Sequence, residues 1–147
     1  MVAVRSFRWQ DRWRTRGYSH KPATKLYNGW LAGVPMMLGV ESAFRAERQS
    51  PLDYWEVATP ADLWSTLVRL KQDADLRRAM VDQGQRRSPA VRPESIVQRW
   101  LDFLRGVALP AYDRWTTRPL WRLGYGQQQR LRATLSRVDT KLRSALP

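Results

Sequence analysis

HKPATKLYNGWLAGVPMMLG, residues 20–39, is the stretch that decides the fold. Its first half predicts a helix that begins with the Thr24 hydroxyl as its N-cap and ends at Gly33, because the apolar side chains between them share one face. Pro35 blocks further helix, and the apolar run from Val34 to Leu38 is short enough for a strand that is buried on both faces. Helix, tight turn and buried strand form half of an α/β unit. The sequence therefore predicts an α/β fold with a small parallel sheet covered by helices.

The start of this helix is basic. Unpaired N–H groups at a helix start attract anions, and Lys21, Thr24 and Lys25 would place two ammonium groups and a hydroxyl around them. A phosphate group fits this arrangement. Two solvated surface lysines beside a capping threonine fit the same pattern, and a short motif does not separate the two interpretations.

Other segments of the chain also have clear local signals. Residues 1–5 and 52–58 have the alternating or aromatic-rich composition of strands, and helical composition follows Glu41. Thr59-Pro60-Ala61-Asp62 is a strong helix start, with a hydroxyl N-cap, a proline at the first helical position and an acidic residue three positions after the cap. Two further helices are expected, one from Ala74 to a stop at Gly84 and one from Pro93. The polar residues between them, 83–92, are expected to be a linker.

The composition describes a folded and strongly basic protein. The chain has 147 residues, 43% of them hydrophobic, and its 26 Lys and Arg against 13 Asp and Glu give a net charge of +13. This charge predicts attraction to polyanions such as nucleic acid, acidic membranes or phosphorylated ligands. Cysteine is absent, which excludes disulfides and thiolate metal sites and is compatible with a cytoplasmic location.

Other classes of protein are excluded by what the sequence lacks. No run approaches about 18 consecutive apolar residues, so no membrane-spanning helix is expected, and the first residues lack the apolar core of a signal peptide. One histidine and scattered carboxylates predict no metal site. No Walker loop, G-x-G-x-x-G or G-x-S-x-G motif is present.

A longer line, KPATKLYNGWLAGVPMMLGVESAFRAERQSPLDYWEV, covers residues 21–57 and is followed by a helix that begins with proline. It resembles the donor-binding half of the second domain of bacterial GT-B glycosyltransferases, in the group with a K-P-x-T-K-L-x-N-x-W-x-A-G-V-P line. The resemblance covers roughly residues 2–104. It implies a partial Rossmann-like domain and transfer of a sugar from a nucleotide diphosphate sugar to an acceptor, with no metal ion or other cofactor.

The resemblance also implies roles for individual residues. Lys21, Lys25 and the N–H groups near Thr24 would hold the diphosphate. In the wider family two glutamates, eight positions apart, contact the donor sugar and the nucleotide ribose, and the matching positions hold His20 and Asn28. Asn28 would bond a ribose hydroxyl, and His20 would meet the sugar or the phosphate. No catalytic residue is indicated.

The loop after the buried strand adds two further candidates. In GT-B proteins this loop faces the donor, so the resemblance makes Glu41 and Ser42 donor-binding candidates. Glu41 fits equally well as a carboxylate that caps the helix after it.

Both ends of the chain are rich in arginine and tryptophan. Between Phe7 and Gly17, Trp9 and Trp13 lie among arginines, a pattern that fits stacking on single-stranded nucleic acid. It also fits a basic loop over the sheet edge, with the tryptophan rings packed on the domain.

Beyond Gly106 the resemblance ends and a basic tail follows. Breaks are expected within it at Pro110, Pro119, Gly124 and Gly126. From Gln127 a basic amphipathic helix is expected. It fits the anionic inner face of a membrane, where it would anchor the protein peripherally, or docking on its own domain or on a partner helix.

These patterns predict a partial donor-binding domain over residues 1–106 and a helical extension over residues 107–147. GT-B enzymes place the reaction between two domains, and the match begins inside a strand. The acceptor domain is therefore expected in a preceding segment or in a partner chain, which makes this chain incomplete as an enzyme. The rival prediction is a basic binding module without catalysis, for nucleic acid or an anionic membrane.

Overall fold

The computed structural model describes residues 1–145, with side chains described as far as Arg143. The chain divides into two compact units, residues 1–91 and residues 92–147. This division differs from the expected one after Gly106, which lies inside a helical stretch of the second unit. Residues 146 and 147 of the expected extension lie outside the described residues.

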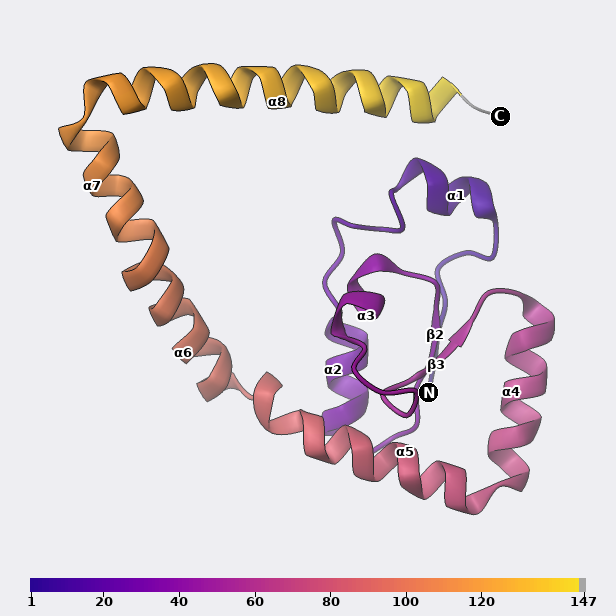
Figure 1. Cartoon of the computed structure of the whole chain (residues 1–147). Helices are drawn as coiled ribbons and strands as arrows, with labels where there is room; N and C mark the ends of the chain where they lie inside the picture. Colours follow the sequence, from indigo (N-terminus) through magenta and orange to yellow (C-terminus); the bar gives the residue numbers. More distant parts are fainter. Residues whose placement is uncertain (146–147) are drawn as a thin grey trace. The chain divides into compact units, whose positions relative to one another are not determined.

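A three-stranded parallel sheet organises the first unit (Figure 1). Its strands are β1 (Val2–Ala3), β2 (Met37–Gly39) and β3 (Trp55–Val57), in the order β1-β2-β3. Met37 lies opposite Val2 on one side and opposite Trp55 on the other. The predicted small parallel sheet is confirmed, with each strand shorter than its apolar run.

Helices cover both faces of this sheet. Successive side chains on a strand point to opposite faces, so Leu38 packs in a cluster with α2 (Thr24–Leu31) and α3 (Ser42–Glu47). Met37 packs instead with α4 (Pro60–Gln72) and α5 (Ala74–Arg87). Figure 1 shows α2 and α4 on opposite sides of the strands. The unit is therefore a three-layer α/β/α structure.

The predicted start of α2 is wrong by one residue, whereas its predicted end is confirmed. Ala23, not Thr24, occupies the N-cap position, and no side chain caps the helix. The small Ala23 side chain is buried in the core. At the other end Gly33 has a φ of +62°, and the N–H of Val34 bonds to the Gly29 carbonyl at 3.0 Å. The helix therefore ends before Gly33, and β2 begins only after Pro35.

The predicted start of α4 is confirmed in detail. The Thr59 hydroxyl accepts a hydrogen bond from the Asp62 N–H at 3.0 Å, and the Asp62 carboxylate accepts one from the Thr59 N–H at 2.9 Å. These bonds form a capping box. Bonds from the Ala58 N–H and from Thr59 lower the pKa of Asp62.

The predicted stop of α5 at Gly84 is wrong, and so is the linker over residues 83–92. The helix passes through Gly84 to Arg87, and a short 3-10 helix, η1 (Ser88–Val91), follows with Ser88 and Val91 buried. Gly84 serves packing instead, because a Cβ there would lie 2.9 Å from Cδ1 of Trp30 on α2. The glycine lets the two helices approach closely.

The second unit is a series of helices: α6 (Pro93–Phe103), the π-helical turn η2 (Leu104–Ala108), α7 (Leu109–Thr117) and α8 (Pro119–Ala145). The predicted start at Pro93 and the break at Pro119 are confirmed. Pro110 does not break the helical stretch: the backbone stays helical through Ala108, and the π-helical turn η2 lies just before the proline. The breaks at Gly124 and Gly126 are wrong, since α8 runs through both and begins well before Gln127.

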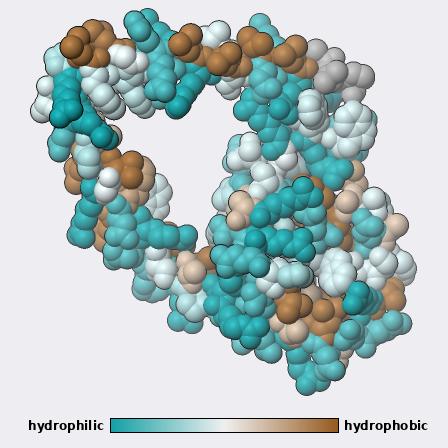
Figure 2. Space-filling view, viewed as in Figure 1, coloured by the Kyte–Doolittle hydropathy of each residue, from teal (hydrophilic) through white to brown (hydrophobic). Residues whose placement is uncertain are grey.

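None of the described side chains of this second unit is buried. Figure 2 shows hydrophobic residues exposed along α7 and α8. Within residues 1–145, no helix combines the length and the apolar character needed to cross a bilayer.

Candidate anion-binding site at the carboxyl edge of the sheet

The carboxyl ends of the three parallel strands lie together along one edge of the sheet. Arg5 follows β1, Glu41 follows β2 and Thr59 follows β3. In open α/β sheets this edge is the usual place for ligands. The short helix α1 (Trp9–Arg14) lies at the same end (Figure 1).

An ion pair joins the ends of β1 and β2. Nε of Arg5 donates to the Glu41 carboxylate at 3.0 Å, and Glu41 is only 3% exposed. Glu41 occupies the N-cap position of α3 but makes no capping bond, so the capping interpretation is wrong. The arginine also lies 5.8 Å from the centroid of the Tyr18 ring. Glu41 therefore holds Arg5 in place at the carboxyl edge.

A left-handed turn follows α1. Arg16, Gly17 and Tyr18 have φ values of 51°, 63° and 58°. This conformation costs roughly 1–2 kcal/mol for each residue other than glycine, so the surrounding contacts must hold it. The Gly17 N–H bonds to the Arg12 carbonyl at 2.7 Å, and the Tyr18 N–H bonds to the Thr15 hydroxyl at 3.1 Å. Sequence reasoning missed this turn, for which Gly17 was the only local signal.

Ser42 ties this turn to α3. Its N–H and its hydroxyl both donate to the Gly17 carbonyl, at 2.8 and 3.0 Å. The predicted site residue Ser42 is thus brought to the segment that leads into His20 and Lys21. Both of these side chains are exposed, and the Lys21 N–H bonds back to the Tyr18 carbonyl at 2.9 Å.

The start of α2 lies a few residues further along the chain. The N–H groups of Leu26 and Tyr27 both bond to the Ala23 carbonyl, at 2.9 and 3.2 Å. The N–H groups of Thr24 and Lys25 precede them in the first turn, where a helix offers no internal partner. Lys25 and Asn28 are both exposed and, three positions apart, lie on the same face of the helix.

The structure thus brings the predicted site residues together in part. His20, Lys21 and Thr24 belong to the segment that leads into α2, while Lys25 and Asn28 continue along its exposed face. Glu41 is withdrawn into its pair with Arg5, and Ser42 holds the turn. Among the described residues, no group of three or more His, Asp or Glu side chains is placed to hold a metal ion.

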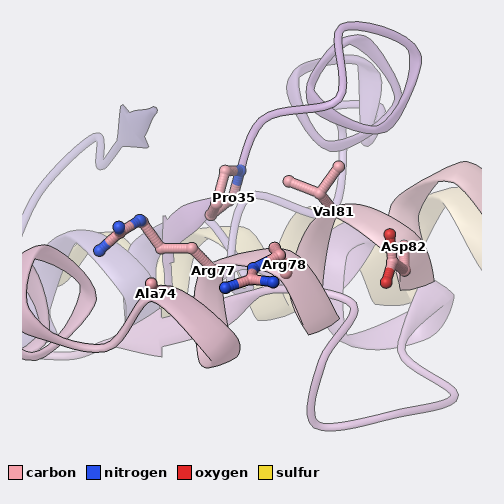
Figure 3. A pocket seen from close by; sticks show the side chains of 6 residues that line it. All are labelled: Pro35, Ala74, Arg77, Arg78, Val81 and Asp82. Atoms are coloured by element: carbon pink, nitrogen blue, oxygen red, sulfur yellow. The ribbon is translucent and has the colours of Figure 1, made fainter.

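A hollow of about 330 Å³ lies toward the opposite end of the sheet, beside the Pro35 segment that leads into β2 (Figure 3). Its two arginines are engaged in local contacts. The Arg77 guanidinium donates to the carbonyls of Leu70 and Lys71 at the end of α4, and Arg78 pairs with Asp75 at 3.2 Å. We therefore interpret this hollow as a by-product of the α4–α5 turn.

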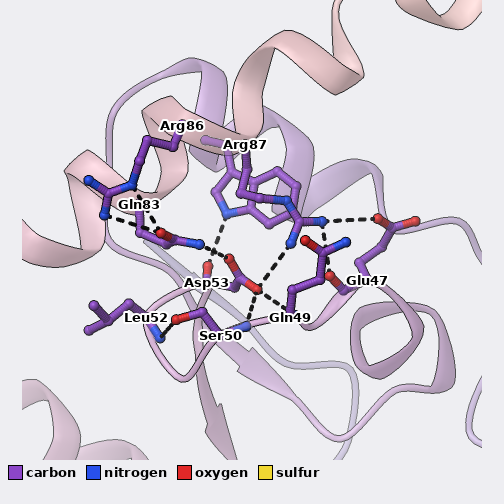
Figure 4. A network of polar contacts seen from close by, with 9 residues as sticks. Glu47, Gln49, Ser50, Leu52, Asp53, Gln83, Arg86 and Arg87 are labelled. Carbon is purple, nitrogen blue, oxygen red and sulfur yellow. Dashed lines mark hydrogen bonds and ion pairs between the residues drawn. The ribbon is translucent and has the colours of Figure 1, made fainter.

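A polar network ties α5 to the segment before β3 (Figure 4). The Asp53 carboxylate, fully buried, accepts bonds from the N–H groups of Gln49 and Ser50 at 2.7 and 2.8 Å, and pairs with Arg87 at 3.3 Å. Burial acts to raise the pKa of Asp53. The bonds from Gln83 and from the backbone, together with the charge of Arg87, outweigh it and lower that pKa. Because both carboxylate oxygens of Asp53 have partners, the network stabilises the fold.

Another ion pair joins α3 to β3, where Glu56 lies opposite Leu38 in the sheet register. Arg45 of α3 donates two bonds to the Glu56 carboxylate, each 2.7 Å long, and the first cause of the lowered pKa of Glu56 is this bonding. Arg48 lies 5.0 Å from the centroid of the Tyr54 ring. The Tyr54 hydroxyl is buried without a hydrogen-bond partner among the described residues, and burial raises its pKa.

The segment between Phe7 and Gly17 contains the short helix α1 rather than only a basic loop. Trp9 and Trp13 on this helix are 59% and 45% exposed. Both side chains are thus partly exposed and partly covered, so stacking on nucleic acid and packing on the domain both stay predictions.

In comparisons with known proteins, no family model, no curated protein and no solved structure matches the chain. The resemblance to GT-B enzymes consequently rests on the line over residues 21–57.

Proposed function

We propose that residues 1–91 bind the diphosphate of a nucleotide sugar at the carboxyl edge of the sheet and form the donor-binding part of a glycosyltransferase. One observation carries the proposal: the start of α2 has no side-chain cap and is flanked by two exposed lysines. An uncapped helix start leaves backbone N–H donors for an anion. The resemblance over residues 21–57 supplies the class of ligand.

The chemistry follows from fixed positive charge. When the sugar leaves the donor, negative charge grows on the diphosphate oxygens. Lys21, Lys25 and the N–H groups of the first turn of α2 would stabilise this charge without moving, which is electrostatic preorganisation. The reaction in this scheme needs no metal ion.

The remaining residues divide into contacts and supports. Asn28 would bond a ribose hydroxyl, and His20 would meet the sugar or a phosphate oxygen. Ser42 would act through Gly17 by holding the turn that leads into His20, and Glu41 by holding Arg5. The acceptor would be bound by a second domain or a partner chain, as in the two-domain enzymes that the sequence resembles.

Calorimetric titration of the full chain with uridine, guanosine and adenosine diphosphate tests the proposal. One of the three should bind, and Lys25→Ala should weaken that binding about tenfold or more, since a bond to a charged group contributes about 1.5–3 kcal/mol. Lys71→Ala, which removes an exposed lysine at the end of α4, is the matched control and should bind as the wild type does. Equal affinity in the Lys25 variant would remove that lysine from the site.

The second candidate is a module for single-stranded nucleic acid, and the exposure of Trp9 and Trp13 among arginines favours it. Such binding should weaken steeply as salt rises, because it depends on the release of counterions. It should also persist in saturating nucleotide sugar. Oligonucleotide binding that shows both properties, together with no diphosphate binding, would replace the donor-site proposal.

A further inference from the structure

The helix α8 contains none of the residues of the proposed donor site and carries an apolar stripe of its own. At about 100° per residue, six aliphatic side chains fall within roughly 120° of its circumference. All six are at least 51% exposed: Leu120, Leu123, Leu131, Leu135, Val138 and Leu142. The helix has 27 residues, so the stripe follows a rod about 40 Å long.

Positive charge borders this stripe on both sides. The helix contains six Lys and Arg and a single acidic residue, Asp139. At the same angular spacing, Arg130, Arg137 and Lys141 lie along one border, and Arg132 and Arg143 along the other. The carboxylate of Asp139 is already engaged, since it accepts bonds from Arg143 at 3.0 and 3.1 Å. The surface beside the stripe is therefore cationic.

An aromatic cluster lies where α7 meets α8. The rings of Trp121 and Tyr125 stack with centroids 5.2 Å apart, and Trp115 meets both edge-on. Tryptophan and tyrosine are enriched at the boundary between lipid headgroups and hydrocarbon, because each ring combines an apolar body with a polar atom.

A second copy of the chain fits this surface poorly. The four C-terminal positions of the stripe have the 4-3-4 spacing of a coiled coil, but Gly124 and Gln128 occupy the two preceding seam positions. A seam this short falls below the three to four heptads that indicate a coiled coil. Pairing would also set rows of cations against one another, with a single acidic residue per helix to offset them.

We propose that α8 lies in the plane of an anionic lipid surface, with its leucine stripe in the outer hydrocarbon and its arginines among the headgroups. This arrangement satisfies both observations at once. The lipid covers the apolar stripe, and the acidic headgroups neutralise the cations on its two borders. The inference goes beyond donor binding, because it assigns an interaction surface to residues that the proposed site does not use.

Vesicle sedimentation of the full chain tests the proposal. The protein should bind vesicles of equimolar phosphatidylcholine and phosphatidylglycerol, fail to bind phosphatidylcholine alone, and be released by high salt. The double variant Leu131→Gln and Leu135→Gln should bind at least about tenfold more weakly, because two aliphatic side chains no longer enter the lipid. Both positions are exposed, so the helix content measured by circular dichroism should be unchanged.

A matched variant separates the stripe from general hydrophobicity. Leu135→Gln with Ser136→Leu keeps the number of leucines but moves one to the opposite side of the helix, and it should also bind weakly. Binding at wild-type strength by either double variant would overturn the proposal. So would analytical ultracentrifugation in which the lipid-free wild type is a dimer and the Leu131/Leu135 variant a monomer, because a second copy would then cover the stripe.

Discussion

Residues 1–91 and residues 92–143 use apolar side chains in opposite ways. All the buried side chains among the described residues lie in the first region, where two clusters fill the spaces on either side of β2. The second region is rich in Leu, Val, Trp and Tyr and buries none of them. The difference lies in topology, because the first region has a sheet against which helices form layers, whereas the second is a series of helices. Apolar residues build a core only where a second layer exists.

The largest expected loss of stability comes from removing the Arg87 guanidinium, which pairs with the buried Asp53 carboxylate in the first region. Arg87→Ala leaves the buried Asp53 carboxylate without its ion pair and removes the guanidinium that lies 4.7 Å from the Trp30 ring centroid. The free energy of unfolding should fall by about 3 kcal/mol. Arg86→Ala is the matched control, since its exposed side chain bonds to Gln83, and it should change stability by less than about 0.5 kcal/mol. Denaturant titration measures the free energy of unfolding of both variants. Similar losses in the two would show that the Arg87–Asp53 ion pair does not stabilise the fold.

Replacing a glycine by alanine should lower stability in the first region and raise it in α8, and Gly84 tests the first of these. Gly84→Ala places a Cβ 2.9 Å from Trp30 Cδ1 and 3.3 Å from Trp30 Cα, so it should destabilise residues 1–91 by about 1–3 kcal/mol. Thermal unfolding of the full chain measures this loss. An unchanged melting temperature would show that α2 and α5 do not need their close approach.

Acid should weaken the first region through Asp53. Its pKa is lowered in the folded state, so the stability that it contributes is present above its ordinary value of about 3.9 and is lost as pH falls through the lower folded value. Asp53→Asn should be less stable at neutral pH, but its melting temperature should fall less steeply from about pH 5 to pH 3. Equal slopes in wild type and variant would remove Asp53 from the acid response.

The smallest effect is expected in α8. A Cβ added at Gly124 meets nothing within 4 Å, so Gly124→Ala should stabilise the helix by about 0.5–1 kcal/mol through backbone entropy alone. Circular dichroism should show equal or greater helix content in the lipid-free protein. A loss of helix would mean that Gly124 is needed for a close contact, and the contrast between the two regions would fail.

The features that were predictable from the sequence are those fixed by neighbouring residues. The capping box of Thr59 and Asp62 needs only four consecutive residues, and the helix end at Gly33 needs only a glycine before Pro35. Gly84 was misinterpreted as a stop because its requirement comes from Trp30, far earlier in the chain. The presence of the three strands followed from the apolar and aromatic runs, although each strand is shorter than its run. The exposed state of the second region followed from topology.

In the candidate site, too, the features set by neighbouring residues were predictable from the sequence and those set by distant contacts were not. The basic segment over His20 and Lys21 was visible in the sequence, and the exposure of Lys25 and Asn28 agrees with a ligand-facing helix. The pairing of Glu41 with Arg5 and the left-handed turn held by Ser42 depend on contacts between distant segments, and no local pattern encodes them. The donor role of these residues stays a prediction.

Hydrogen–deuterium exchange of the full chain, alone, with the diphosphate that binds, and with equimolar phosphatidylcholine–phosphatidylglycerol vesicles, tests the central claim that the two regions present separate surfaces to separate ligands. The diphosphate should slow amide exchange in residues 16–26, and the vesicles should slow it in residues 119–143. Each ligand should leave the other segment unchanged, and the core strands should be protected throughout. Vesicles that add no protection to residues 119–143, or protection of one segment by both ligands, would contradict the account.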